Sequence, residues 1–90
     1  MKFRAVLSKD AQKELSKLDR AAQKQIQRYI DEHLEGLIDP RRHGKALTGD
    51  WKGLWRYETG NYRIICRIKD DVCEILAVRL GHRKNVYNKK

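Results

Sequence analysis

The chain has 90 residues, which is the size of one domain and leaves no room for a second. With 40% hydrophobic residues and a single proline, it carries enough apolar side chains for a compact core, and this excludes low-complexity disorder. The longest nearly apolar run, residues 75–78, is far shorter than the ~20 residues that a membrane-spanning helix needs. The first residues become polar before the apolar stretch of a signal peptide develops. We therefore expect one domain over residues 1–90, located in the cytoplasm.

The charge of the chain gives the first functional indication. Lys and Arg number 21 against 12 Asp and Glu, so the formal net charge is +9. A surplus of this size is self-repelling in a small domain, and a polyanion would balance it. Nucleic acid is the commonest partner of this kind and an acidic protein is the next, although a well-solvated basic surface would give the same composition.

The two cysteines, Cys66 and Cys73, form no CxxC motif and are too few for a disulfide scaffold. We expect both of them to be buried free thiols. No histidine has the spacing to both thiols that a zinc site requires, and the acidic residues are scattered rather than clustered. The sequence therefore predicts no metal and no cofactor.

The first forty residues predict a strand followed by a helical hairpin. Residues 2–7 begin with the alternation of polar and apolar side chains that is typical of a short strand. Ser8 is a favourable N-cap for a first helix, Asp19 is one for a second, and Pro40 closes the second helix. An apolar stripe along the second helix predicts its core-facing side; it consists of Ala22, Ile26, Tyr29, Ile30, Leu34 and Leu37.

The hydrophobic pattern then changes to a period of two. After a basic connection over residues 41–50, we predict three strands over residues 53–58, 62–68 and 72–80. Short polar turns separate these strands, so they form consecutive antiparallel hairpins. We therefore predict an α+β fold with an N-terminal strand, a helical hairpin and a three-stranded antiparallel meander. Together they give a small, mostly antiparallel sheet with the helices on one face.

The last hairpin determines which side chains share a face of this sheet. A two-residue turn at Asp70-Asp71 would pair Lys69 with Val72 and place Arg67 opposite Glu74. The core-facing set would then comprise Ile64 with Ala77, Cys66 with Ile75, Ile68 with Cys73, and, from the first hairpin, Trp55 and Tyr57. A three-residue turn in the first hairpin would reverse its two faces.

The other face of the sheet receives a group of arginines. Arg56 and Arg63 would lie opposite or diagonal to each other with only Glu58 to share, and an anion would relieve their repulsion. Arg83 would join them if the chain turns back over this face after the last strand. Each arginine alone is explained equally well by a solvated side chain. Together with the net charge, the group predicts a phosphate-binding face.

Four short segments at sensible spacings carry a family resemblance. They are Gly44–Gly49 (GKALTG), Gly53–Arg56 (GLWR), Gly60–Ile65 (GNYRII) and Gly81–Tyr87 (GHRKNVY). In this combination the sequence resembles a RelE-type toxin of the RelE/ParE toxin–antitoxin superfamily. The preceding strand and helical hairpin match the order of elements in that family, so the likeness covers nearly the whole chain. It implies a small α+β domain with a mostly antiparallel sheet packed on a helical hairpin.

The resemblance also implies a function. Members of the RelE branch cut messenger RNA in the ribosomal A site without a metal, and a cognate antitoxin with an acidic wrapping segment neutralises them. It implies a ribosome-dependent endoribonuclease that uses 2′-OH attack, with mRNA, ribosomal RNA and an antitoxin as partners. A ParE-like inhibitor that binds DNA gyrase and an RNA-binding module without activity are the alternatives. Convergent arginines favour the nuclease, because an inhibitor that binds a protein needs no phosphate-binding groups.

By position, the resemblance assigns site roles to Arg63, to Arg83 after the last strand and to Tyr87 near the end of the chain. Arg56 matches one of two basic residues that the RelE branch often carries on one strand. Leu54 stands where the other would lie, which is a departure from the family pattern. Either another basic residue replaces it, or the activity is weaker or uses different groups; the candidate replacements are Lys45, Lys52 and His82.

The chemistry of cleavage by a 2′-OH suggests how these residues would act. It requires charge neutralisation at the phosphorane and a proton for the departing 5′-oxygen. Arg56 and Arg63 suit the first task, with Arg83 close to the leaving group. His82 is the predicted proton donor because imidazole titrates near neutral pH, although a histidine that merely caps the strand end is an equal alternative. Tyr87 would stack on a base or hold the 2′-OH, unless it simply packs back on the sheet.

The remaining basic side chains have a less specific expected role. Lysines and arginines outside the cleavage site typically hold nucleic acid through its phosphates. The candidates for anchoring RNA in this way are Arg41, Arg42, Lys45, Lys52, Lys89 and Lys90.

Overall fold

Both predicted caps begin helices in the computed structural model, which describes residues 1–87. Ser8 Oγ accepts a hydrogen bond from the Ala11 N–H at 3.0 Å, and Asp19 Oδ1 accepts one from the Ala22 N–H at 2.8 Å. The helices that follow are α1 (Lys9–Ser16) and α2 (Arg20–Tyr29), and α2 continues into a π-helical turn over Ile30–Leu34. Within residues 1–87, no helix is long and apolar enough to cross a membrane.

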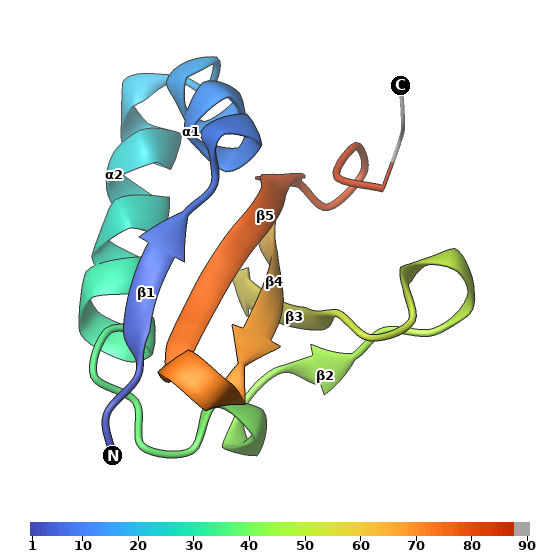
Figure 1. Ribbon diagram of the computed structural model, residues 1–90. Coiled ribbons are helices and arrows are strands. Elements are labelled where there is room, and N and C mark those ends of the chain that lie inside the picture. The colour runs from blue at the N-terminus through green and yellow to red at the C-terminus, as the bar shows by residue number, and fades with distance from the viewer. Residues whose placement is uncertain (88–90) are drawn as a thin grey trace.

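The strands of the structure form one five-stranded sheet (Figure 1). They are β1 (Arg4–Leu7), β2 (Lys45–Ala46), β3 (Trp55–Thr59), β4 (Tyr62–Lys69) and β5 (Glu74–His82). Their order is β1-β5-β4-β3-β2, with β1 parallel to β5 and every other pair antiparallel. The predicted α+β class is therefore confirmed. The short strand β2 lies inside the segment for which the sequence predicted only a connection.

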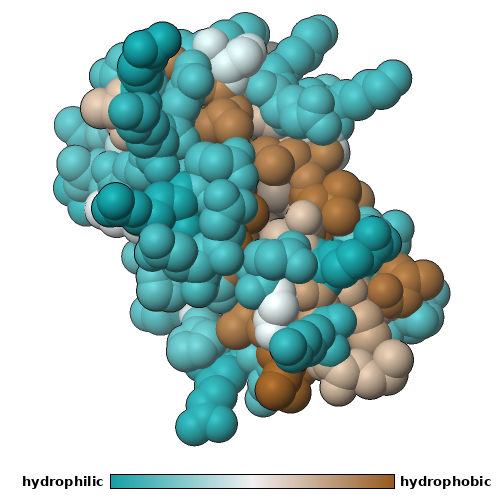
Figure 2. Space-filling view, turned by 90° about the vertical axis from the view of Figure 1, so that its left-hand side faces the viewer, coloured by the Kyte–Doolittle hydropathy of each residue, from teal (hydrophilic) through white to brown (hydrophobic). Residues whose placement is uncertain are grey.

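The core lies between the two helices and one face of the sheet (Figure 1). Tyr57 and Cys66 are fully buried there, and Trp55 packs against the cluster, as the sequence predicted. Both cysteines are free thiols, but Cys73 is only half-buried, so its predicted burial was wrong. Figure 2 shows one face of the molecule, which is largely hydrophilic and carries a band of hydrophobic residues running down it.

The predicted register of the last hairpin was wrong by two positions. A 3₁₀ turn over Asp70–Val72 replaces the two-residue turn, and Cys73 follows it in the left-handed region with φ of 50°. Lys69 consequently pairs with Glu74, and Arg67 lies opposite Leu76 instead of Glu74. The core-facing pairs move in the same way, to Cys66 with Ala77 and Ile68 with Ile75. Because the shift is two residues, every side chain of β5 as far as Ala77 stays on its predicted face of the sheet.

A β-bulge further along β5 reverses which side chains of the strand face the core. The pairing passes from Cys66 with Ala77 to Ile65 with Arg79, so β5 contains one extra residue at this point. Beyond the bulge Leu80 faces the core, where it is buried, and Arg79 points to the face without helices. The bulge therefore adds an arginine to a face where the sequence did not predict it.

We expect Tyr57→Phe to lower the free energy of unfolding by about 1–2 kcal/mol. The buried Tyr57 hydroxyl donates a hydrogen bond of 2.6 Å to the Pro40 carbonyl, which the variant would leave without its donor. Burial raises the pKa of Tyr57 above its usual value, so the hydroxyl stabilises the fold below about pH 10 and this contribution is lost at higher pH. Urea unfolding at pH 7 and above pH 10 tests both points. Tyr62→Phe is the control, because the Tyr62 hydroxyl makes no hydrogen bond within residues 1–87, and an equal loss in it would contradict the prediction.

Candidate functional site

The face of the sheet without helices carries arginines on three neighbouring strands. Arg56 of β3 and Arg79 of β5 lie on either side of Ile65, which is fully buried although it sits on this face. Arg63 of β4 is two residues before Ile65 and pairs with Glu58 across the β3–β4 ladder. The guanidinium groups therefore surround an apolar floor.

One carboxylate serves two of these arginines. Glu58 Oε2 lies 2.8 Å from Arg63 Nε, with hydrogen-bond geometry, and 3.4 Å from Arg56 Nε, without it. Arg56 Nε is buried and has no hydrogen-bond partner within residues 1–87. Two guanidinium groups sharing one carboxylate leave a positive charge unbalanced, as the sequence predicted for this pair.

The chain turns back over this face after β5. Val86 is buried against it, and a Cβ built on Gly81 would lie 4.0 Å from the Val86 Cβ. The Tyr87 ring contacts Trp51 edge to face, with 5.4 Å between the ring centroids, and lies 5.8 Å from Arg63 Cζ. The ring therefore packs back on the sheet beside an arginine, and its hydroxyl is buried without a hydrogen-bond partner within residues 1–87. We call the surface formed by Arg56, Glu58, Arg63, Arg79 and Tyr87 the arginine face.

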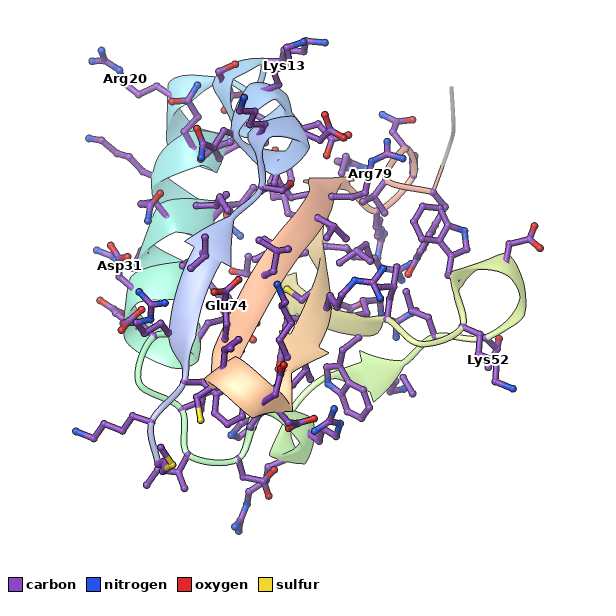
Figure 3. All side chains as sticks on the ribbon, in the orientation of Figure 1. Lys13, Arg20, Asp31, Lys52, Glu74 and Arg79 are labelled. Carbon is purple, nitrogen blue, oxygen red and sulfur yellow. The ribbon has the colours of Figure 1, made fainter. Side chains whose placement is uncertain are left out.

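A second carboxylate, from helix α1, holds Arg79. Glu14 Oε2 accepts a hydrogen bond from Arg79 Nε at 2.8 Å, and Glu14 Oε1 accepts one from the Leu80 N–H, also at 2.8 Å. β1 pairs with β5 only as far as Ala77, so Glu14 takes the place of a neighbouring strand where β5 extends further. Figure 3 shows Arg79 near the end of β5, beside the C-terminal turn. Neither residue could be predicted from the sequence, because a bulge and a contact between residues 65 positions apart leave no local pattern.

Arg83 lies in the turn that follows β5. Its backbone N–H donates a hydrogen bond of 2.8 Å to the Asn61 carbonyl in the β3–β4 turn, which fixes the returning chain to the first hairpin. The side chain of Arg83 is exposed and has no carboxylate within 4 Å among residues 1–87. It is therefore a solvated cation close in the chain to the arginine face.

The structure does not bring His82 into this group. His82 pairs with Tyr62 on the helix-facing side of the sheet, and their rings contact edge to face at 5.7 Å between centroids. Its Nδ1 also accepts a hydrogen bond from the Lys84 N–H at 3.1 Å. Side chains alternate along a strand, so a residue next to Gly81, which pairs with Arg63, points away from that arginine. The geometry matches the alternative of a histidine at the end of a strand.

The other predicted RNA-anchoring residues are dispersed. Lys45 of β2 pairs with Arg56 and is exposed at the edge of the arginine face. Lys52 extends away from the sheet (Figure 3). Arg42 is exposed in the 3₁₀ turn after α2, next to Arg41. Lys89 and Lys90 lie outside the described residues.

Arg41 belongs to a different local structure. Its guanidinium donates two hydrogen bonds of 2.9 Å to the Asp70 carboxylate, at the opposite end of β4 from Arg63. These hydrogen bonds hold the pKa of Asp70 below its usual value and raise the pKa of Arg41. The pair joins two turns at the surface, so Arg41 is already occupied by a carboxylate of its own.

Within residues 1–87, no three His, Cys, Asp or Glu side chains are grouped so that they could hold a metal ion. The arrangement on the arginine face instead offers permanently charged hydrogen-bond donors above an apolar floor. Groups of this kind bind phosphate and planar carboxylate ligands.

Comparisons with known proteins agree with this fold. The family model described as the ParE toxin of type II toxin-antitoxin systems, parDE, matches residues 5–87. Toxin RelG of Mycobacterium tuberculosis is 31% identical over 51 residues, which is 57% of this chain and 59% of that protein. The chain thus matches somewhat more than half the length of this curated relative.

Solved structures resemble the whole domain. The RelBE2 toxin–antitoxin complex of Mycobacterium tuberculosis contains a chain with a TM-score of 0.82 and 24% identity, matched over 92% of this chain and 100% of that one. The isolated RelE toxin of E. coli gives a TM-score of 0.68 at 16% identity, over 98% and 88% of the two chains. The archaeal RelE–RelB complex of Pyrococcus horikoshii gives 0.66 at 22% identity, over 96% and 100%. At sequence identities this low, the similarity to these structures supports a shared fold alone.

Proposed function

Because the chain belongs to the ParE toxin family of type II toxin–antitoxin systems, within the RelE/ParE superfamily, we propose that it cuts messenger RNA in the ribosomal A site without a metal and so arrests translation. The single observation that carries this proposal is the shared carboxylate of the arginine face. Arg56 and Arg63 have only Glu58 between them, so a bound phosphate would supply the missing negative charge. A toxin that acts only by docking to a protein does not require such a deficit.

The proposed reaction uses the 2′-OH of the message as nucleophile and leaves a 2′,3′-cyclic phosphate and a 5′-OH. Arg56 and Arg63 neutralise the charge that grows on the phosphorane, because guanidinium groups stay charged and bind two phosphate oxygens at once. Arg83, exposed and beyond 4 Å of any carboxylate in residues 1–87, contacts the phosphate on the leaving side. The Tyr87 ring stacks on a base of the message beside Arg63.

The same proposal includes the partners of the protein in the cytoplasm. Lys45 and Lys52 are exposed and hold ribosomal RNA through its phosphates. A cognate antitoxin with an acidic wrapping segment neutralises the toxin. The net charge of +9 supports both kinds of partner, because each is polyanionic.

Mapping the ends of cellular RNA after induction of the protein tests the function. We expect new 5′-OH ends on ribosome-bound messages, at a fixed position within the codon that occupies the A site. A ParE-like inhibitor of DNA gyrase is the second candidate, since the matching family model describes a ParE toxin. Intact messages together with stalled replication would support that candidate and reject cleavage. Growth arrest with intact messages and normal replication would instead support an RNA-binding module without activity.

A further inference from the structure

The proposed function leaves one role unfilled, and the inference drawn here rests on that function. Attack by the 2′-OH is fast only if a side chain accepts its proton. Arginine cannot do this, because its guanidinium is not deprotonated in proteins. Leu54 moreover occupies the position at which the family resemblance expects a second basic residue. A proton acceptor must therefore come from another type of side chain.

Two nearby side chains are poor candidates. His82 lies on the helix-facing side of the sheet, and its Nδ1 already accepts a hydrogen bond from the Lys84 N–H. The Tyr87 hydroxyl is buried, and phenol hydroxyls remain protonated at neutral pH. Neither is suited to accept a proton from RNA bound over the arginines.

Within residues 1–87, two carboxylates form ion pairs with the arginines of this face, those of Glu14 and Glu58. They differ in how many of their oxygens already accept a hydrogen bond. Both oxygens of Glu14 accept hydrogen bonds, one from Arg79 Nε and the other from the Leu80 N–H. Glu14 is therefore a structural anchor, because each of its two oxygens is already engaged by β5. Glu58 uses only Oε2, and its Oε1 has no hydrogen-bond donor within residues 1–87.

Exposure also distinguishes Glu58 from its neighbours. Its side chain is 45% exposed, whereas those of Arg56 and Arg63 are 20% and 24% exposed. The carboxylate thus stands at the surface between the two guanidinium groups that would bind the phosphate. The hydrogen bond from Arg63 Nε fixes Oε2 and leaves Oε1 accessible to solvent and to a ligand.

We propose that Glu58 is the general base of this site. Glu58 Oε1 removes the proton of the 2′-OH, the 2′-oxygen forms a bond to phosphorus, and the bond from phosphorus to the 5′-oxygen breaks. The 5′-oxygen takes a proton from a solvent water, and Glu58 returns the proton it received to the solvent. Arg56 donates no side-chain hydrogen bond within residues 1–87, so its outer N–H groups are available to the phosphate during this step.

The test is the cleavage of a fluorescent mRNA bound to the ribosome, followed at saturating and subsaturating toxin. For Glu58→Gln we expect the maximal rate to fall by about 10²–10⁴-fold. The half-saturating concentration should stay equal or become lower, because the variant removes a negative charge next to the phosphate. Glu58→Asp should restore part of the maximal rate, because it restores a carboxylate at this position.

Glu74→Gln is the matched control. Glu74 lies on the same face at the far end of β5, near Arg4 and Lys69, so its replacement changes the net charge equally without touching the arginine face. We expect wild-type kinetics for it. Circular dichroism and thermal unfolding verify that each variant is folded. If Glu58→Gln does not fold, Glu58→Asp decides: its displaced carboxylate should lower the maximal rate without raising the half-saturating concentration.

Three results would overturn the inference. An equal or higher maximal rate in Glu58→Gln would mean that the carboxylate only competes with phosphate. A raised half-saturating concentration with an unchanged maximal rate would mean that Glu58 acts in binding alone. A Glu58→Asp variant no more active than Glu58→Gln would mean that the carboxylate does not accept the proton. In each of these cases the wild type still cleaves mRNA, so the proposed function stands while the role of Glu58 is rejected. A wild type that cuts no message overturns both the proposed function and the role of Glu58.

Discussion

Arg63→Ala is expected to reduce cleavage of ribosome-bound mRNA by about 10²–10³-fold and to abolish growth arrest. Arg63 contributes one of the two guanidinium groups at the shared carboxylate, and its charge lies 5.8 Å from the centre of the Tyr87 ring. Its loss removes charge stabilisation from the transition state and frees the carboxylate that it holds. The fold should persist, because the side chain is at the surface of the sheet and outside the core.

Arg67→Ala provides the control for this experiment. Arg67 lies on the same strand and the same face, four residues further along, and it is exposed with no ion pair within residues 1–87. The control should cleave mRNA at nearly the wild-type rate. Both variants should still bind the antitoxin. Persistent growth arrest in Arg63→Ala, or an equal loss in both variants, would contradict a specific role for Arg63.

Gly44→Ala is expected to lower the free energy of unfolding by about 3 kcal/mol or more. Gly44 adopts φ of +74°, a conformation that costs an L residue energy. A Cβ at this position would also collide with the backbone carbonyl of Arg56 and lie 2.8 Å from Trp55 Nε1 and 3.0 Å from Tyr57 Cδ1. The main-chain atoms of β3 cannot move aside without disturbing the sheet.

Gly49→Ala separates the two causes of that loss. Gly49 has a similar φ of +62°, but a Cβ there would meet no atom within 4 Å. The control variant should therefore lose only about 1–2 kcal/mol, which is the cost of the backbone conformation. Unfolding in guanidinium chloride measures both values. Equal losses would show that the contact with β3 is unimportant.

The elements that local patterns specify were predicted correctly. Ser8 and Asp19 cap their helices through their own side chains, and the two-residue Gly60-Asn61 turn joins β3 and β4 in a register in which Trp55 and Tyr57 face the core, as predicted. That register is sufficient to bring Arg56, Arg63 and Glu58 together. This part of the candidate site therefore follows from the alternation of side chains along two adjacent strands.

The rest of the site depends on features without a local signature. Cys73 adopts a left-handed conformation that glycine or asparagine usually occupies, so a longer turn at this position could not be predicted from the residue type. The bulge in β5 then changes which residues face outward, and this places Arg79 on the arginine face and Leu80 in the core. His82 was misplaced relative to the arginines for the same kind of reason. The side of the sheet that it occupies depends on the pairing of the last strand.

The parallel pairing of β1 with β5 has a consequence for synthesis of the protein on the ribosome. The first strand finds its neighbour only among residues 74–77, near the other end of the chain. Arg79 and Tyr87, which complete the arginine face, come later still. Long-range pairing of this kind forms only after the intervening chain is available. A nascent chain therefore lacks the assembled face until residues 79–87 can pair and pack against the earlier strands.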